Sequence, residues 1–363
     1  MMQQVRVGWE ELVRFTRGVF LSLGAGDEEA ADSADILVAA DAKGIVSHGT
    51  ARLRRYVNGV LAEIMVPRTP FTVLQETPIS LTVDANGAMG LHVSKQVMER
   101  VIRKAHDAGA AFASVRDSNH FGIAGYYAQM ALEHDMIGIA MTNTAALGVP
   151  TFGREVYFGT NPIAVAVPAS REAPFILDMS TTVVTRGKVE TYAREGGSLP
   201  NGWAVDIQGL PTGDASTLLN TMLHQLGGGI LPLGGSGELH GGHKGYGLAV
   251  LVDICTALFS GGTFGRAVMD SAETSARVCH FFGAVRIDRF RKPDEFKADM
   301  DRMLADLVQA VPAEGEKRIF YAGLKEHLHE EECRKLGIPL SVKVYQQLLD
   351  IADQQGVMPP EKL

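Results

Sequence analysis

The chain has 363 residues, more than a single hydrophobic core ordinarily organises, and this length predicts two or three domains. Hydrophobic residues make up 46% and charged residues 21%, the balance of a globular protein. With 34 Lys and Arg against 42 Asp and Glu, the net charge of −8 disfavours a protein that coats nucleic acid. The 40 glycines exceed the usual share of about 7% and indicate many turns and ligand loops.

The first sixty residues predict three helices. An apolar stripe from Trp9 to Leu21 indicates the first, and the second runs from a cap at Asp27 to Ala42. Ser47 is expected to cap the third, which continues to about residue 61 with one apolar face.

From about residue 70, short β-branched runs alternate with helical stretches, which predicts an α/β fold. The expected strands are Ile79–Val83, Ala111–Val115, Ile137–Thr142, Ile163–Val167, Phe175–Asp178 and Val278–Ile287. The expected helices are Val93–Ala108, Phe121–His134, Leu248–Phe259, Asp294–Val311 and Ser341–Asp353. We therefore predict an N-terminal helical part (1–75), a central α/β domain (76–293) and a C-terminal helical part (294–363) that packs against the first.

Cysteine use and hydropathy predict the compartment. Cys255, Cys279 and Cys333 lie far apart in the sequence, which indicates free thiols in a reducing environment and no structural zinc. The N-terminal residues are too polar for a signal peptide, and the most apolar stretch, at 247–259, is interrupted by Asp253. We expect a cytoplasmic protein without membrane or nucleic-acid partners. The histidine pairs near residues 240 and 328 have no third ligand in sequence, so no metal site is predicted.

The first candidate site is the Ser47-His48-Gly49 segment with Arg52. A histidine at a helix N-terminus has a lowered pKa, because the helix dipole disfavours its cationic form. A neutral His48 beside Arg52 suits proton transfer next to a bound carboxylate. An ordinary surface helix start would have the same residues.

The second candidate is Asp117–Gly122, which follows a predicted strand and opens a predicted helix. Ligand-binding side chains collect at such positions in open α/β sheets. His120 and Asn119 could therefore bind a substrate oxygen or move a proton, although a solvent-facing loop histidine is an equal alternative.

The third candidate is Gly241–Gly247, which contains Lys244 and leads into an apolar helix. Glycines let the backbone approach a phosphate, and a helix N-terminus favours an anion. The alternative is a glycine-rich turn with an incidental lysine. No Gly-x-Gly-x-x-Gly follows an early strand, so the usual dinucleotide fingerprint is missing.

These motifs stand in a series of segments that resembles the malate/L-lactate dehydrogenase family, whose members lack a Rossmann fold. The matching segments are SHGTAR (47–52), DSNHFGIAGYY (117–127), MIGIAMTNT (136–144), FGTNPIAVAVP (158–168), LDMSTT (177–182), RGKV (186–189), WAVD (203–206) and GGHKGYGLA (241–249). They occur in family order along nearly the whole chain.

The resemblance implies a non-Rossmann α/β domain with a mixed sheet that binds NAD or NADP, with NAD slightly preferred. It implies a helical domain from both termini, and homodimers with an active site between subunits. The cofactor-binding residues that it implies are Thr144, Asp178, Met179, Ser180, Lys188, His243, Lys244, Gly245, Gly323, Leu324 and Lys325. Where the family has Pro-Gly-x-Glu, this chain has Ala322-Gly323-Leu324-Lys325, without the proline and with the charge reversed.

The activity implied is interconversion of a 2-hydroxy acid and a 2-keto acid. The family's catalytic histidines correspond to His48 and His120. We expect His48 to exchange the proton, with Asp178 orienting it and Ser47 as a further catalytic residue. His120 is either a second oxygen ligand or the true acid/base.

Three further residues are expected to bind the substrate: Arg52 at its carboxylate, with Asn119 and Asn143. Two alternatives remain open. One is reduction of a cyclic imine carboxylate such as piperideine-2-carboxylate. The other is a nucleotide sensor without catalytic activity.

Overall fold

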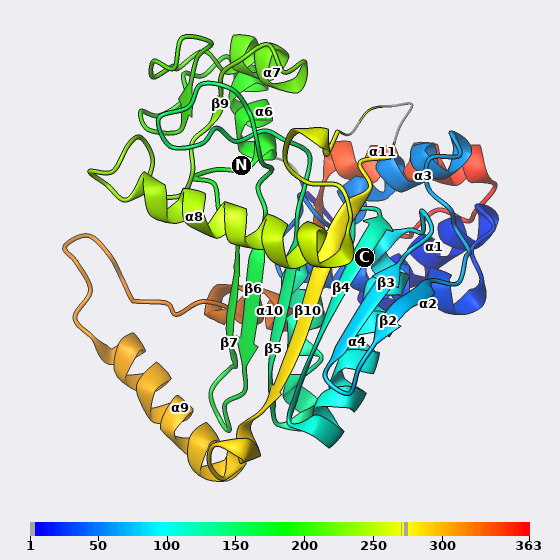
Figure 1. Ribbon diagram of the computed structural model, residues 1–363. Helices are drawn as coiled ribbons and strands as arrows, with labels where there is room; N and C mark the ends of the chain where they lie inside the picture. Colours follow the sequence, from blue (N-terminus) through cyan, green and yellow to red (C-terminus); the bar gives the residue numbers. More distant parts are fainter. Residues whose placement is uncertain (1–3, 270, 272–274) are drawn as a thin grey trace.

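The computed structural model describes residues 4–269, 271 and 275–363. A mixed sheet runs through its centre, with helices on both faces (Figure 1). In spatial order its seven strands are β2 (Thr72–Glu76), β3 (Ser80–Asp84), β4 (Ala110–Ser118), β10 (Val278–Arg286), β5 (Met136–Thr142), β6 (Ile163–Val167) and β7 (Phe175–Met179). β3 and β4 pair parallel, whereas the other neighbours pair antiparallel. The predicted α/β class with a mixed sheet is confirmed.

The pairing directions determine where functional segments meet. β4 and β5 are each antiparallel to β10, so these two strands point the same way. β7 also points this way, because it is separated from β5 by two antiparallel steps. The carboxyl ends of β4, β5 and β7 therefore lie at one edge of the sheet, which is where ligands bind in open α/β sheets.

Each face of the sheet has its own helices. α4 (Gly90–Ala108) contacts β4 and β10, and α5 (Ala124–Gln129) contacts β5 and β6. α8 (Gly242–Asp253) and the π-helical η3 (Ile254–Leu258) cross the opposite face (Figure 1). α5 approaches closely because β5 has Gly138, where a Cβ would lie 1.9 Å from the carbonyl oxygen of Ala128.

The two ends of the chain pack together. The N-terminal part comprises β1 (Gln4–Val7), α1 (Trp9–Ser22), α2 (Asp27–Ala42), η1 (Thr50–Arg52) and α3 (Leu53–Leu61). The C-terminal part comprises α10 (Leu324–Leu336), β11 (Ile338–Ser341) and α11 (Val342–Gln355), and β11 pairs antiparallel with β1. One continuous hydrophobic core joins these helices to α4 and the sheet.

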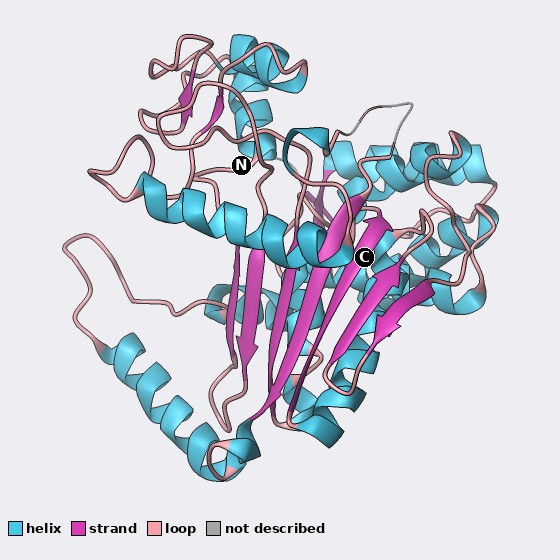
Figure 2. Cartoon of the chain, in the orientation of Figure 1, coloured by secondary structure: helices cyan, strands magenta, loops and turns pink. Residues whose placement is uncertain are grey.

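Two smaller units extend from the sheet. α9 (Pro293–Gln309) packs beside the β6–β7 hairpin through Met300 and Leu304. Residues 183–231, which we call the small lobe, contain α6 (Arg186–Glu195), β8 (Ala204–Val205), α7 (Ala215–Leu223) and β9 (Gly229–Ile230). The small lobe has its own core and is rich in loops (Figure 2). Within the described residues, no helix combines the length and hydropathy needed to cross a membrane.

Three local predictions are wrong. Ser47 caps no helix, because the segment begins as the 3-10 turn η1 with Gly49 at its N-cap and no side-chain cap. The helix expected at 121–134 is limited to α5 and the 3-10 turn η2 (Leu132–His134). The apolar helix expected from Leu248 begins earlier, at Gly242. β1 and β11 were missed, since an isolated strand pair of four residues each gives little periodicity.

Candidate functional site

Two histidines from distant segments meet beside the sheet edge. His48 lies in the loop between α2 and η1, and His120 directly follows β4. Their rings stack with centroids 5.5 Å apart and planes inclined by 26°. Both side chains are half-buried. The structure thus brings together the two histidines that sequence motifs singled out separately.

Tyr56 of α3 fixes the orientation of His120. The Tyr56 hydroxyl lies 2.7 Å from His120 Nδ1, and the Gly122 N–H donates to the same nitrogen at 3.3 Å. A backbone N–H can only donate, so this network assigns Nδ1 as an acceptor and places the proton of the neutral ring on Nε2. His120 therefore has an Nε2–H as its remaining donor. Tyr56 is fully buried, and the sequence analysis missed it as a site residue.

Ser47 connects His48 with Arg52. The Ser47 hydroxyl lies 2.9 Å from His48 Nδ1, and its carbonyl accepts a hydrogen bond from Arg52 Nε at 2.7 Å. Asp178, which we expected to orient His48, instead accepts from the Gly125 N–H at 2.7 Å. Within the described ranges no hydrogen bond joins Asp178 to His48. The contact at His48 Nδ1 is made by Ser47.

The environment holds both histidines neutral. The pKa of His48 is lowered to about 4, first by burial and then by the nearby charges of Arg52 and Arg55. Burial likewise lowers the pKa of His120 well below its usual value, with His48 and the two arginines adding to the effect. The lowered pKa of His48 agrees with the sequence analysis. The cause differs, because desolvation dominates and His48 precedes η1.

A buried carboxyl supports the loop that carries His48. Asp41 Oδ2 accepts hydrogen bonds from the Thr50 N–H at 2.8 Å and the Thr50 hydroxyl at 2.6 Å. Gly49 passes so close that a Cβ there would lie 2.0 Å from Asp41 Oδ1. Burial raises the pKa of Asp41 to about 7. The sequence analysis missed Asp41, because a lone aspartate inside a helix gives no local signal.

Positive charge gathers around Arg52. The pKa of Arg52 is lowered by burial first, and then by the nearby charges of Arg55 and Arg186. Arg186 opens α6 and donates to Glu190 at 2.6 Å. The charge of Glu190 raises the pKa of Arg52. The Arg186–Glu190 ion pair therefore acts electrostatically on the same site. The small lobe thus contributes charge to the histidine site.

A hollow of ≈ 250 Å³ lies between β7, α5 and the loop before α10. Its polar walls come from Asp178, Glu326, Lys43, Lys325 and Gln129, and its apolar walls come from side chains such as Ile123, Ile176 and Phe320. Asp178 is accessible from this hollow, yet the surrounding walls remove most bulk water and raise its pKa to about 6. Two predicted cofactor segments, at 178 and at 323–325, therefore meet.

The loop before α10 is held against β7. The Ile176 N–H donates to the Ala322 carbonyl at 3.0 Å. Gly323 has φ +94°, and a Cβ there would lie 2.9 Å from Ile176 Cβ, so only glycine fits. Leu324 is buried against α9, whereas Lys325 is exposed and lies 4.7 Å over the Phe320 ring.

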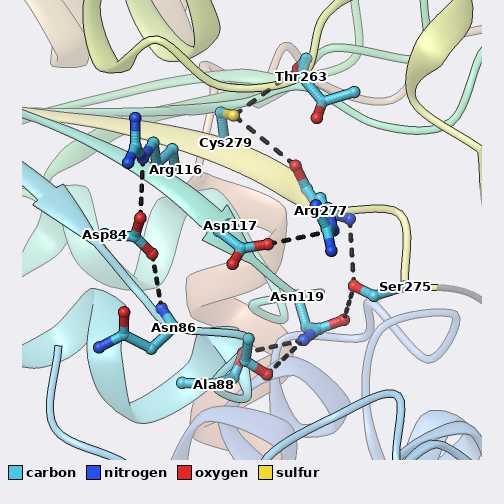
Figure 3. Close-up of polar contacts among 11 residues, drawn as sticks. Asp84, Asn86, Ala88, Arg116, Asp117, Asn119, Thr263, Ser275, Arg277 and Cys279 are labelled. Atoms are coloured by element: carbon cyan, nitrogen blue, oxygen red, sulfur yellow. Dashed lines mark hydrogen bonds and ion pairs between the residues drawn. The ribbon is translucent and has the colours of Figure 1, made fainter.

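Asn119 and Asn143 are both buried and bonded within the chain. Asn119 Nδ2 donates to the Gly87 and Ala88 carbonyls at 2.9 and 3.0 Å, and its Oδ1 accepts from the Ser275 hydroxyl at 2.8 Å (Figure 3). Asn143 Nδ2 donates to the Thr263 carbonyl, and its Oδ1 accepts from the Cys279 N–H. This arrangement favours a role in shaping the loops over direct contact with substrate.

The other predicted cofactor residues have varied positions. Thr144 follows β5, and its hydroxyl accepts from the Thr160 N–H at 2.9 Å. Met179 ends β7, and the Ser180 hydroxyl donates to the Thr182 carbonyl at 3.0 Å.

Lys188 on α6, together with His243 and Lys244 in the first turn of α8, is exposed. Gly245 is buried, and a Cβ there would lie 2.3 Å from the Leu233 carbonyl oxygen. Across residues 4–269, 271 and 275–363, no three His, Cys, Asp or Glu side chains are grouped to hold a metal.

Comparison with known proteins identifies the family. The profile of the malate/L-lactate dehydrogenase family matches residues 7–349. The chain belongs to this family. It is 43% identical to a malate dehydrogenase of Pyrococcus abyssi over 97% of this chain and 96% of that protein. It is 34% identical to an L-sulfolactate dehydrogenase of Methanocaldococcus jannaschii over 93% and 94% of the two chains.

The fold agrees with this membership. A crystal structure of malate dehydrogenase from Entamoeba histolytica superposes with a TM-score of 0.94 at 31% identity, covering 99% of this chain and 100% of that one. The protein is therefore a dehydrogenase of the malate/L-lactate dehydrogenase family, and its relatives imply a nicotinamide cofactor. The hollow around Asp178 fits such a group, since apolar walls suit a base, carboxylates suit ribose hydroxyls, and Gly323 leaves room for close approach.

Proposed function

We propose that the protein interconverts a 2-hydroxy acid and its 2-keto acid with NAD(P), using His48 as the acid/base. The observation that carries this proposal is the stacked His48–His120 pair next to Arg52, with both rings neutral. A neutral imidazole can take the hydroxyl proton during oxidation. A fixed guanidinium can hold the carboxylate next to the reacting carbon.

The two histidines have different roles in this proposal. The nicotinamide supplies or takes up the hydride when it is bound. His120 donates its Nε2–H as a hydrogen bond to the substrate oxygen, because Tyr56 and Gly122 occupy Nδ1. His48 removes the hydroxyl proton during oxidation and returns it during reduction. Arg52, tied to the Ser47 carbonyl, orients the carboxylate relative to His48.

We further propose a substrate with a second anionic group, such as malate. Arg52 lies in the field of Arg55 and Arg186, with Glu190 as the opposing charge. A substrate with two negative groups would balance this field better than one with a single carboxylate. Binding of a dianion would also raise the pKa of His48 toward neutrality, which assists proton return during reduction.

A substrate panel tests both statements. Purified protein is assayed with oxaloacetate, sulfopyruvate, pyruvate and piperideine-2-carboxylate, each with NADH and NADPH. We expect kcat/KM to be highest for the two dianions and to fall by ~10–100-fold for pyruvate, because one charge-assisted contact is lost. Preference for the cyclic imine, or NADH binding without turnover of any keto acid, would contradict the proposal.

For the cofactor we propose a preference for NAD. Asp178 and Glu326 both line the hollow, and Lys43 is already paired with Glu330 at 2.7 Å. Carboxylates accept hydrogen bonds from ribose hydroxyls and repel a 2′-phosphate. Fluorescence titration should give a lower Kd for NADH than for NADPH, and Glu326→Gln should narrow the difference. A lower Kd for NADPH in the native protein would contradict this preference.

We also propose a homodimer located in the cytoplasm. α8 and η3 expose Leu251, Ile254, Leu258 and the following Phe259, with accessible fractions from 36% to 62%. Such an apolar helix face is typical of a subunit interface. Light scattering should give twice the chain mass, and Leu258→Glu should shift it toward the monomer. All three cysteines are free, which suits a reducing compartment.

A further inference from the structure

The start of β10 lies between the two loops that carry predicted site residues. Opposite Cys279 of β10, strand β4 has two residues, Arg116 and Asp117, and Asp117 has φ +51°. This is a β-bulge, which bends a strand and re-aims the side chains that follow it. Figure 3 shows Asp117 of the bulge paired with Arg277, just before β10, and Asn119 bonded to Ser275. The bulge therefore directs the segment that carries His120.

His280 is the next residue of β10, and it is fully buried. Its Nε2 lies 2.8 Å from the Ser118 hydroxyl at the end of β4, and its Nδ1 lies 2.8 Å from the Thr142 hydroxyl at the end of β5. Its ring stacks on Phe121 with a centroid distance of 4.5 Å and an angle of 3°. One imidazole thus contacts both strand ends and the residue next to His120.

The hydroxyl partners assign the direction of each hydrogen bond. Thr142 Oγ1 has two carbonyl acceptors within reach, Asn143 at 2.9 Å and Cys279 at 3.1 Å. Its proton is therefore used there, and its oxygen accepts from His280 Nδ1–H. His280 Nε2 then accepts from the Ser118 hydroxyl, whose carbonyl alternative is more distant, at 3.5 Å. Burial lowers the pKa of His280 to about 3, so the ring remains a neutral bridge.

We infer that His280 is a positioning residue that ties the loop carrying His120 to the loop carrying Thr144. It touches neither substrate nor cofactor. It fixes the spacing between the part of the site that binds the substrate oxygen and the part that we expect to contact the cofactor. This inference rests on the proposed function for its kinetic consequences. Its structural content, a bridging neutral imidazole with the proton on Nδ1, does not depend on that function.

Each of the two hydrogen bonds of His280 can be removed separately. Ser118→Ala removes the bond on the His120 side, and Thr142→Val removes the hydroxyl on the Thr144 side with little change in volume. We expect Ser118→Ala to lower kcat by ~5-fold with an unchanged Kd for NADH. We expect Thr142→Val to raise the Kd for NADH by ~5-fold. Equal changes in the same parameter for both variants would overturn the inference.

His280→Phe keeps the stacked ring and removes both hydrogen bonds. We expect both effects together, with kcat falling by ~10-fold or more, since small misplacements of reacting groups are costly. The matched control is Phe15→Leu, a buried position of α1 in the same core, which should lower Tm and leave kcat and Kd unchanged. If His280→Phe lowers Tm but keeps kcat, KM and Kd within ~2-fold, His280 is only structural and the inference is wrong.

A spectroscopic readout separates failure of the inference from failure of the proposed function. Histidine labelled with ¹⁵N, with resonances assigned through His280→Phe and His120→Asn, reports the protonated nitrogen of each ring without any turnover. We expect His280 to carry its proton on Nδ1 at every pH from 5 to 9, and His280→Phe to shift the His120 resonances. Protonation of His280 on Nε2, or unchanged His120 resonances, would overturn the inference even if no keto acid is reduced.

Discussion

The histidine site and the exposed cations of the small lobe and α8 are built in opposite ways. His48, His120 and Arg52 are each held by a hydrogen bond to a neighbouring group, and burial keeps the two histidines neutral. Lys188 and Lys244 are exposed, so their charges are screened by water and salt. Where proton transfer is proposed, groups are fixed before the substrate arrives. Where only an anion is to be attracted, an exposed charge is sufficient.

Among variants of the groups that surround the two histidines, the largest effect is expected at Arg52. Arg52→Lys keeps the positive charge but loses the planar fork and the bond from Nε to the Ser47 carbonyl. We expect KM for the keto acid to rise by ~10–100-fold, because a charge-assisted hydrogen bond contributes about 1.5–3 kcal/mol. Steady-state kinetics measure this. Arg54→Lys, at a half-buried neighbour bonded to Gln354, serves as control, and an equal effect there would contradict a specific role for Arg52.

The next effect concerns the support beneath His48. Asp41→Asn weakens the contact to Thr50 and should lower kcat by ~5-fold while the Kd for NADH is unchanged. Thr50→Val, which removes the hydroxyl, should act in the same direction, and Thr50→Ser should retain activity. An unchanged kcat in both Asp41→Asn and Thr50→Val would show that the loop does not depend on this contact.

Asp41 also makes the free energy of unfolding depend on pH. Its pKa is raised to about 7 in the folded protein, so the folded state binds a proton that the unfolded chain releases at a lower pH. The contribution of Asp41 to the free energy of unfolding is fully present below about pH 4 and is lost as the pH rises through about 7. The difference in Tm, Asp41→Asn minus wild type, should therefore be more positive at pH 8 than at pH 5. A difference independent of pH would contradict the raised pKa.

A smaller effect is expected at Tyr56. Tyr56→Phe removes the hydroxyl that lies 2.7 Å from His120 Nδ1 and keeps the buried ring. The Gly122 N–H still donates to this nitrogen, so we expect kcat to fall by only ~3–5-fold. Tyr345→Phe, which removes a buried hydroxyl bonded to the Pro360 carbonyl away from the site, should leave kcat unchanged. A loss above a thousandfold would mean that Tyr56 itself delivers the proton.

The smallest effect is expected at the exposed cations. Lys244→Gln should raise the Kd for NADH by ~2–3-fold at low ionic strength, and the difference should vanish near 0.5 M salt. Lys343→Gln, another exposed lysine, is the matched control and should have no effect. A tenfold change that persists at high salt would place Lys244 in a desolvated contact and remove the contrast with the histidine site.

Much of the fold could be predicted from local sequence. β6 was predicted at its bounds from a short β-branched run, and the structure places Ile163–Val167 at alternately half-buried and buried positions. The expected helices at 93–108 and 294–311 correspond to α4 and α9 within a few residues. β1 and β11 could not be predicted, because their pairing joins residues more than 330 positions apart. α5 begins later than predicted, at Ala124, because the backbone turns at Gly122, with φ +81°.

The candidate site could be predicted only in part. Motifs selected His48, Arg52 and His120, but their mutual geometry depends on the packing of α3 against the end of β4. Tyr56 and His280 belong to no sequence motif. Their roles follow from contacts with residues 64 and 138 positions away, His120 and Thr142 respectively. Asn119 and Asn143 were predicted to bind substrate, and in the structure their amides are bonded to main-chain and loop atoms. Sequence position alone cannot distinguish these two uses of a buried amide.

The central claim, that His48 exchanges the proton while His120 holds the oxygen, is tested by one pair of variants. His48→Ala and His120→Ala are compared by kcat for reduction of the preferred keto acid, with the Kd for NADH as a check that the cofactor still binds. The account predicts a loss of ~10²–10⁴-fold in kcat for His48→Ala, a smaller loss for His120→Ala and nearly unchanged Kd values. Full activity in His48→Ala together with loss of activity in His120→Ala would contradict it.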